Sequence, residues 1–442
     1  MHRNRSSLGS WLRLRLWLAP FVAAVTMEVA AAQNDPDEVL ATGGHTLDFA
    51  YSNDGTEVAA FVVPGATQDE IVVQSRTTQG GAWTQLYRGK LGLLNRIVDL
   101  SVALADDFPG SAGDDMVFLG VHGVWRSGGG ELGFTGLLSG SYRNAWPAAT
   151  CAEILPEGGA SYARPWPGMK LSCAIVPLIG ARSTDYAVAV AFKFPLFTSD
   201  SIQLAYSRDH GRSVERSRIV AGPLGECIDA VGRFGWPCVI GDSTNREVVV
   251  SFDQEDLGQI VLANAEAIAH VDGSTRLAIN WVTPDQNGGR EHRGTLGRFD
   301  GEINLVCLFG DANSNQGYRM TWFYGSTLAG FREVFDFNGI SMFQGDRAVT
   351  PPDIDIRGSD ARIAALCITD TGGKTPGVGV IAWESSRLGE ERLRVQVSDG
   401  ALSFADPPRA KVAIAPRGSP YRAYSYGFCA YGSQPGKVCI DP

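Results

Sequence analysis

One pattern recurs along this chain: an apolar run, a short polar turn and a second apolar run. It occurs seven times, at 47–63, 98–121, 172–192, 238–252, 267–282, 305–323 and 353–369. The first copy is the clearest, because Asn53-Asp54-Gly55 between two apolar runs is a turn typical of β-hairpins. No amphipathic helical pattern follows the N-terminal segment. The sequence therefore predicts an all-β fold built from repeated hairpins.

The hairpins are followed by weaker strands of alternating character. Examples are EIVVQSR with WTQLYRG, SIQLAYS with VERSRIV, and ERLRVQV with a ragged outer segment at 411–415. A strand that is buried on both faces is continuously apolar, whereas a strand with one wet face alternates. This gradient predicts a β-propeller of mostly four-stranded antiparallel blades. Seven blades are preferred. Six remain the alternative, because the steps between the starts at 238, 267 and 305 are short for four-stranded blades. Two β-sandwich domains are the alternative, although no linker lies near the middle of the chain.

The N-terminus predicts a signal peptide over residues 1–32, followed by one propeller domain over 33–442. Arginines among the first fifteen residues precede an apolar stretch, which ends in Ala30-Ala31-Ala32. The alternative is an uncleaved anchor, but the apolar stretch is short and contains Glu28. We expect a secreted or periplasmic protein that is soluble after cleavage. The oligomeric state is left open.

Charge and cysteine content limit the partners and the compartment. The formal charge of −10 and the lack of a later basic run argue against nucleic acid. An even number of cysteines, eight, favours disulfides over a metal site, because no Cys-x-x-Cys spacing is present. The suggested pairs are Cys151–Cys173, Cys227–Cys238, Cys307–Cys367 and Cys429–Cys439, although spacing does not determine connectivity.

A short turn motif carries a family resemblance. The run Ser207-Arg208-Asp209-His210-Gly211-Arg212-Ser213-Val214 resembles the Asp-box, or BNR repeat, of sialidase-like β-propellers, Ser-x-Asp-x-Gly-x-Thr/Ser-Trp, with Val214 in place of the final aromatic. A degraded copy lies at 75–83. The resemblance implies that Ser207, Asp209 and Gly211 are structural. Ser and Asp side chains can bond the backbone of a tight turn, and Gly takes the left-handed conformation.

Sialidase chemistry is not supported by further motifs, since the Arg-Ile-Pro motif of active sialidases is absent. Glycoside hydrolysis needs two carboxylates that face one bond. Aspartates recur near the starts of inner strands, and Asp99 and Asp353 are the candidate catalytic residues. The competing interpretation, which we favour, has these aspartates capping strands and bonding neighbouring backbone amides. Asp353 and Asp355 are also weak candidates for a Ca²⁺ site, although no cofactor is required.

The long connections at 140–170, 221–237 and 416–442 concentrate aromatic and arginine side chains. Such groups bind sugars by stacking and hydrogen bonding, or they cover a thin loop core. The candidate ligand-binding residues are Tyr142, Arg143, Trp146, Arg164, Trp166, Arg233, Tyr421, Arg422 and Tyr424. We therefore expect a glycan-binding propeller without the complete sialidase catalytic set. The alternatives are a glycoside hydrolase that uses central carboxylates and a protein-interaction scaffold.

Overall fold

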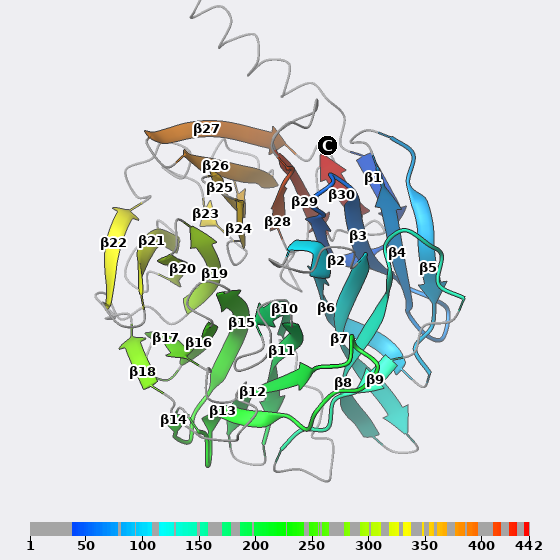
Figure 1. Ribbon diagram of the computed structural model, residues 1–442, viewed down its shortest axis with the longest axis horizontal. Helices are drawn as coiled ribbons and strands as arrows, with labels where there is room; N and C mark the ends of the chain where they lie inside the picture. The colour runs from blue at the N-terminus through cyan, green and yellow to red at the C-terminus, as the bar shows by residue number, and fades with distance from the viewer. Residues whose placement is uncertain are drawn as a thin grey trace, which may run out of the picture.

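A computed structural model gives the fold. The ranges that it describes are 38–77, 81–92, 94–107, 115–127, 130–147, 151–157, 170–177, 186–196, 199–226, 228–242, 247–254, 256, 259–264, 278–282, 292–299, 302–310, 318–326, 330–336, 347–348, 353–357, 360–368, 376–384, 387–396, 410–416, 424–430 and 437–441. Within these ranges the chain forms seven sheets arranged around a central axis, as Figure 1 shows. Five of the sheets have four strands and two have five. The fold is a β-propeller, as the sequence predicts.

Each of the first three sheets starts with a strand near the axis and continues outward. The first sheet contains β2 (His45–Tyr51), β3 (Glu57–Val63), β4 (Glu70–Arg76) and β5 (Thr84–Gly89). The second contains β6 (Leu94–Leu104), β7 (Met116–Ser127), β8 (Gly130–Ser141) and β9 (Cys151–Glu153), with the 3₁₀ turn η1 (Ala105–Asp107) after β6. The third contains β10 (Leu171–Pro177), β11 (Tyr186–Pro195), β12 (Asp200–Ser207), β13 (Arg218–Gly222) and the parallel addition β14 (Ile228–Asp229).

Three further sheets continue the ring. The fourth contains β15 (Phe234–Asp242), β16 (Glu247–Gln254), β17 (Gln259–Asn264) and β18 (Ala278–Val282). The fifth contains β19 (His292–Phe299), β20 (Glu302–Gly310), β21 (Tyr318–Ser326) and β22 (Gly330–Asp336). The sixth contains β23 (Arg347–Ala348), β24 (Asp353–Arg357), β25 (Asp360–Ile368), β26 (Pro376–Glu384) and β27 (Arg387–Gln396).

The seventh sheet, here called the closing sheet, joins the two ends of the described chain. It contains β28 (Ala410–Ile414), β29 (Tyr424–Ala430), β30 (Lys437–Asp441) and, outermost, β1 (Glu38–Thr42). β1 pairs antiparallel with β30, and Glu38 stands opposite Ile440. The buried Arg76 guanidinium bonds Glu57 at 2.6 Å and Glu38 at 2.7 Å. The Arg76 network therefore fixes β1 to the first sheet, and the strand pairing fixes it to β30.

The hydrophobic core lies between the sheets. Alternate side chains of a strand point to opposite faces, so each blade packs against the blades on both sides. One cluster joins the β2–β5 and β6–β9 sheets through residues such as Val73 and Leu119. Another joins the β10–β14 and β15–β18 sheets through Val176 and Val239. No helix of the described residues is long and apolar enough to cross a membrane.

Four of the seven predicted hairpins, those starting at 47, 98, 172 and 238, coincide with the first two strands of a blade, and the one starting at 353 coincides with β24 and β25, the inner hairpin of the sixth sheet. The one placed at 305–323 is β20 and β21, the second and third strands of the fifth sheet. The one placed at 267–282 was wrong as a blade start, because its second run contains β18, the outer strand of the fourth sheet. The segment at 411–415, predicted to be an outer strand, lies in and just after β28, the innermost strand of the closing sheet.

The predicted Cys151–Cys173 disulfide is not formed, and both side chains are free thiols. Cys151 lies on β9, the outermost strand of its sheet, whereas Cys173 lies on β10, the innermost strand of the next. Several strand spacings of about 4.8 Å separate such positions, which is beyond the reach of a disulfide. Burial raises the pKa of each thiol to about 12. Cys227 lies outside the described residues, and the side chains of Cys307, Cys367, Cys429 and Cys439 are not described. The other three pairings therefore stay predictions.

Candidate functional site

The inner strands carry a repeated carboxylate arrangement. Asp48 on β2 accepts the Phe49 amide at Oδ1 (3.0 Å) and the Val102 amide of the next blade at Oδ2 (2.8 Å). Asp99 on β6 does the same, with Leu100 at 3.0 Å and Leu171 of the following blade at 2.9 Å.

Asp355 on β24 repeats this arrangement at the joint between the sixth sheet and the closing sheet. It accepts the amides of Ile356 at 2.8 Å and of Ile414, on the closing sheet, at 2.7 Å. These inter-blade carboxylates therefore join neighbouring inner strands, which is the structural interpretation that the sequence favoured.

Beside these joints, one lysine bridges two carboxylates from different blades. Lys411 on β28 places its Nζ 3.3 Å from Asp48 Oδ1 and 3.4 Å from Asp353 Oδ1. Asp353 also accepts the Val412 amide at Oδ2, 3.0 Å away. Burial raises the pKa of Asp353 to about 6, although the Lys411 charge opposes the shift. Asp353 is thus a perturbed carboxylate near a second one, whereas Asp99 accepts a backbone amide at each of its two oxygens.

A second polar group is built on the β2–β3 turn, Ser52-Asn53-Asp54-Gly55-Thr56. Ser52 Oγ donates to Asp54, and the Thr56 amide donates to Ser52 Oγ at 2.9 Å and to Asp54 Oδ1 at 3.0 Å. Gly55 has a φ of +88°, the left-handed conformation that this turn requires. The turn holds the Asp54 carboxylate at the mouth of the propeller axis, with 44% of its side chain exposed.

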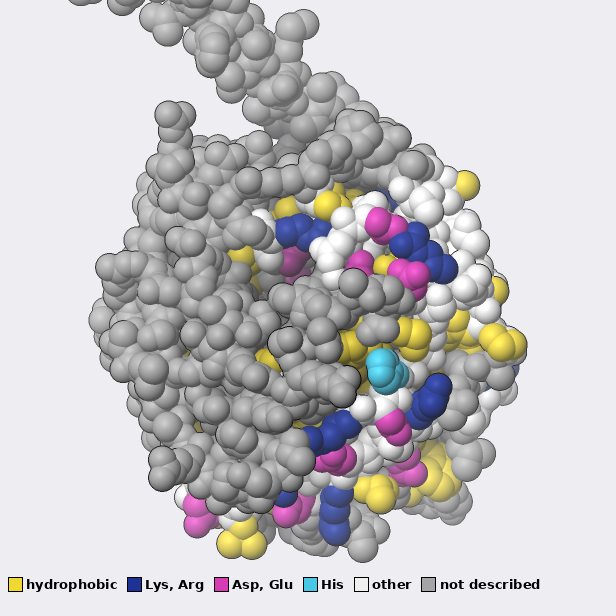
Figure 2. Space-filling model, in the orientation of Figure 1, with side chains coloured by type: hydrophobic (Ala, Val, Ile, Leu, Met, Phe, Trp, Pro, Cys, Tyr) yellow, Lys and Arg dark blue, Asp and Glu magenta, His cyan; other side chains and the backbone are white. Residues whose placement is uncertain are grey.

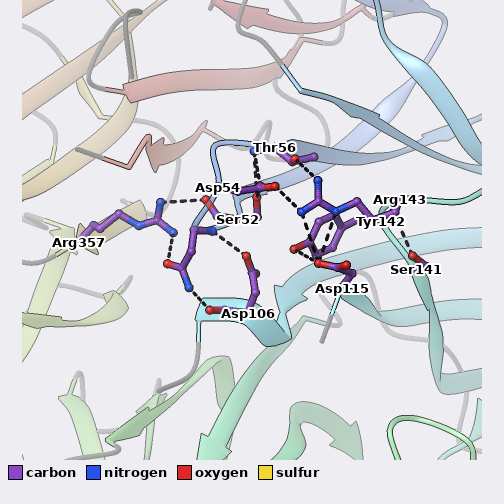
Figure 3. Close-up of polar contacts among 10 residues, drawn as sticks. Ser52, Asp54, Thr56, Asp106, Asp115, Ser141, Tyr142, Arg143 and Arg357 are labelled. Carbon is purple, nitrogen blue, oxygen red and sulfur yellow. Dashed lines mark hydrogen bonds and ion pairs between the residues drawn. The ribbon is translucent and has the colours of Figure 1, made fainter. Parts of the chain in front are cut away.

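The neighbouring blade supplies Arg143 to this turn (Figure 3). Its Nη2 donates to Asp54, and its Nε lies 3.4 Å from Asp115 Oδ1. Burial alone would raise the pKa of Asp54, but hydrogen bonds from Ser52, Thr56 and Arg143 hold it well below its ordinary value. Arg143 and Asp115 are 37% and 45% exposed, so both remain accessible to solvent.

A third blade reaches the same turn from the other side. Arg357, at the end of β24, donates to the backbone oxygens of Tyr51 and Ser52, each at 3.1 Å, and to Asn53 Oδ1 at 3.3 Å. The Asn53 amide donates to Asp106 Oδ2 at 2.7 Å. The other oxygen of Asp106, Oδ1, is buried without a hydrogen-bond partner among the described residues.

Side chains of three blades thus converge on one turn, and we call them the mouth cluster: Asn53, Asp54, Asp106, Asp115, Arg143 and Arg357. Figure 2 shows basic and acidic side chains beside one another on this face of the molecule.

Sequence reasoning proposed Arg143 as a ligand-binding residue, and the structure places it at the centre of the mouth cluster. It did not identify Asp54, Asp115 or Arg357 as site residues. The Asn-Asp-Gly turn signalled only a hairpin, and Asp54 and Arg143 are separated by 89 positions. They lie close together because two blades pack against each other, and a local sequence pattern cannot predict that packing.

The aromatic candidates beside Arg143 have a packing role instead. Tyr142 is 1% exposed, and its hydroxyl donates to Asp115 Oδ1 at 2.9 Å. Trp146 stacks on Tyr87 with ring centroids 5.4 Å apart and donates to the Ser141 carbonyl at 2.7 Å. Both rings thus pack against neighbouring groups of the protein, as in the interpretation that they cover a loop core, and their role in ligand binding stays a prediction.

The remaining candidates are not brought to the mouth cluster by any described contact. Arg233, just before β15, is exposed, and its amide donates to Asp256 at 2.7 Å. Arg164, Trp166, Tyr421 and Arg422 lie outside the described residues, and Tyr424 is described only as the first residue of β29. Their roles stay predictions.

The predicted calcium site gains no support. No group of three or more His, Cys, Asp or Glu side chains within the described ranges could hold a metal ion. The carboxylates of Asp353 and Asp355 both accept amides of β28.

The turn at Ser207–Ser213 joins β12 to β13 and has the hydrogen bonds expected from its sequence. The Gly211 amide donates to Ser207 Oγ at 2.8 Å, and the Ser213 amide donates to Asp209 Oδ1 at 2.8 Å. Gly211 has a φ of +81°. Ser207, Asp209 and Gly211 thus take part in the internal bonding and backbone geometry of the turn.

No protein-family model matches this sequence, and no curated protein matches it. Among solved structures, an ulvan lyase of polysaccharide lyase family PL25 has 11% identity and a TM-score of 0.51, with 92% of this chain and 91% of that chain covered. A PL25 ulvan lyase bound to -[GlcA(1-4)Rha3S]- has 11% identity and a TM-score of 0.50, with 88% and 90% covered.

The α-L-arabinanase of Penicillium chrysogenum complexed with arabinobiose has 10% identity and a TM-score of 0.46, with 92% of this chain and 98% of that chain covered. At such identities the likeness is one of fold. This chain shares its fold with carbohydrate-active β-propeller enzymes.

Proposed function

We propose that this protein is a secreted or periplasmic glycan-binding β-propeller and that the mouth cluster binds the glycan. The observation that carries the proposal is the convergence of exposed donors and acceptors from three blades on the Ser52–Thr56 turn. Saccharides present many hydroxyl groups in fixed geometry, and they are recognised by rigid arrays of such polar side chains.

The chemistry of the cluster supports a polar, uncharged or weakly anionic ligand. Arg143 has five N–H donors, and the Asp115 carboxylate is only partly engaged by Tyr142 and Arg143. Binding to this rigid array would require little rearrangement, because the turn is fixed by its own bonds.

A glycan array followed by calorimetric titration tests the proposal. Arg143→Ala should weaken binding at least tenfold, whereas Arg88→Ala should leave it unchanged. Arg88 is a matched control, because it is an exposed arginine that pairs with Glu70 at 2.8 Å on the outer strand β5. A protein that binds no glycan, or whose binding survives Arg143→Ala, would contradict the proposal.

Glycoside hydrolysis is the second candidate function, and Asp353 is the observation that favours it. Its raised pKa of about 6 suits a general acid, and Asp48 lies on the other side of Lys411. Against it, each carboxylate already accepts a backbone amide. Turnover of chromogenic glycosides that is lost in Asp353→Asn and kept in Arg143→Ala would favour the hydrolase over the binder.

A further inference from the structure

The start of β2 holds a strained residue at the end of the strand opposite to the mouth cluster. Thr46 has a φ of +57°, an uncommon conformation that is especially costly for a β-branched side chain. It lies in a β-bulge, since the pairing of β2 with β3 shifts register between His45 and Leu47. Bulges and strained residues both concentrate at functional sites.

The strain brings two neighbouring side chains together. In a regular strand His45 and Thr46 would point to opposite faces. Here the Thr46 hydroxyl lies 3.0 Å from His45 Nδ1. The other ring nitrogen, Nε2, lies 3.6 Å from Asp69 Oδ2. The imidazole of His45 thus lies between the Thr46 hydroxyl and the Asp69 carboxylate, with one ring nitrogen near each.

Asp69 is held in place by the next blade. Its Oδ2 accepts the Ile97 amide at 2.8 Å, and its own amide donates to the Asn95 carbonyl at 3.0 Å. The His45 and Asp69 side chains are 14% and 11% exposed, and Thr46 is buried at 8%, so the group is sheltered and only the imidazole and the carboxylate are partly exposed.

From this geometry we infer that Thr46, His45 and Asp69 form a hydrolytic triad that cleaves acyl esters. The order hydroxyl–imidazole–carboxylate is the arrangement in which a base activates a hydroxyl nucleophile and a carboxylate orients the base. The distance of 3.6 Å between His45 Nε2 and Asp69 Oδ2 is longer than a hydrogen bond, and catalytic contacts of this kind often tighten only when substrate binds.

The reaction needs no cofactor. Thr46 Oγ1 attacks the acyl carbonyl carbon while its proton passes to His45 Nδ1, and the ester C–O bond breaks as the alcohol leaves with that proton. Water then attacks the acyl-threonine carbonyl and gives a proton to His45. The carboxylic acid departs as the proton returns to Thr46 Oγ1. Asp69 stabilises the imidazolium in both halves of the reaction.

The test uses the full chain and p-nitrophenyl acetate as the probe. Thr46→Val, which keeps the shape and removes the hydroxyl, should reduce the hydrolysis rate at least 100-fold, and Thr46→Ser should retain measurable activity. Thr135→Val is the matched control, because Thr135 Oγ1 also contacts a histidine, His122 Nδ1 at 2.8 Å, but in a fully buried pair. It should hydrolyse at the wild-type rate.

Two further measurements keep the test decisive. Diisopropyl fluorophosphate should add its phosphoryl group to the peptide that contains Thr46, as read by mass spectrometry. If Thr46→Val fails to fold by circular dichroism, His45→Gln replaces it and should be inactive. Wild-type hydrolysis no faster than that of folded Thr46→Val or His45→Gln, or labelling elsewhere in the chain, would overturn the triad. Either result is independent of glycan binding, which depends on Arg143 at the other end of β2.

Discussion

Two turns of this propeller have nearly the same internal chemistry and different surroundings. In Ser52–Thr56 and in Ser207–Ser213, a serine hydroxyl and an aspartate carboxylate bond turn amides, and a glycine takes a positive φ. The first turn joins the two innermost strands of its blade and receives arginines from two other blades. The second joins outer strands, and Asp209 bonds Ser207 and Ser213 of its own turn.

The difference shows that turn chemistry alone does not determine what a turn does. Both turns lie on the same face, because the first and third connections of an antiparallel blade emerge at the same end. Only the inner turn lies where several blades meet at the axis. Position within the blade therefore decides whether an aspartate turn is isolated or becomes the centre of a polar network.

The largest expected change in stability concerns the two glycines. Here the outer turn, Ser207–Ser213, should be the more sensitive of the two. Gly211→Ala should destabilise the protein by about 3 kcal/mol, because a Cβ there would lie 2.7 Å from the Ser139 side chain in addition to the backbone strain. Gly55→Ala should cost only about 1–2 kcal/mol, since its nearest contact would be Pro416 at 3.9 Å. Urea denaturation of both variants measures the difference. Equal losses would show that the Ser139 contact relaxes.

The aspartates should follow the opposite order. Asp54→Ala should cost about 2 kcal/mol, because it removes bonds within the turn and the Arg143 contact. Asp209→Ala should cost about 1 kcal/mol, because it removes only bonds within the turn. The same urea experiment applies. A loss at Asp209 that matched the loss at Asp54 would mean that the inter-blade contacts add no stability.

The smallest expected effect is the dependence on pH and salt. The folded-state pKa of Asp54 is lowered, so its contribution to stability is complete above its ordinary value of 3.8 and is lost as the pH falls below that value. Salt should weaken this contribution, because Arg143 is charged, whereas the serine partners of Asp209 are neutral. Denaturation of wild type, Asp54→Asn and Asp209→Asn between pH 3 and 7, at low and at 1 M salt, checks both points.

The sequence predicted the fold class and most hairpins because a strand that is buried on both faces must be a run of apolar residues. The prediction failed where a strand has few apolar residues or where its position depends on residues that are distant in the sequence. β19 reads HRGTLGRF, which has too few apolar residues to be predicted as a first strand, so the hairpin at 305–323 was placed on the second and third strands of its blade. The role of 411–415 depends on β1 and β30, whose pairing joins residues about 400 positions apart.

The sites were less predictable than the fold for the same reason. Arg143 was found because charged and aromatic residues cluster in its loop, but Arg357 gave no signal, since its partners belong to another blade. The residue types His45 and Thr46 do not predict a positive φ at the threonine. Such a conformation is imposed by the bulge and is visible only in the folded chain.

The closing sheet has a consequence for how the protein is made. β1 is synthesised first and its partner β30 last, so β1 must wait for about 400 residues of translation. At ordinary elongation rates this delay is roughly 20–80 s. Until β30 is made the ring is an open arc, and Asp353 and Asp355, made late in that interval, have no amides of β28 to accept until residues 410–414 follow. The nascent chain therefore contains an unpaired strand, β1, until β30 is made, and unsatisfied carboxylates on β24 until β28 is made.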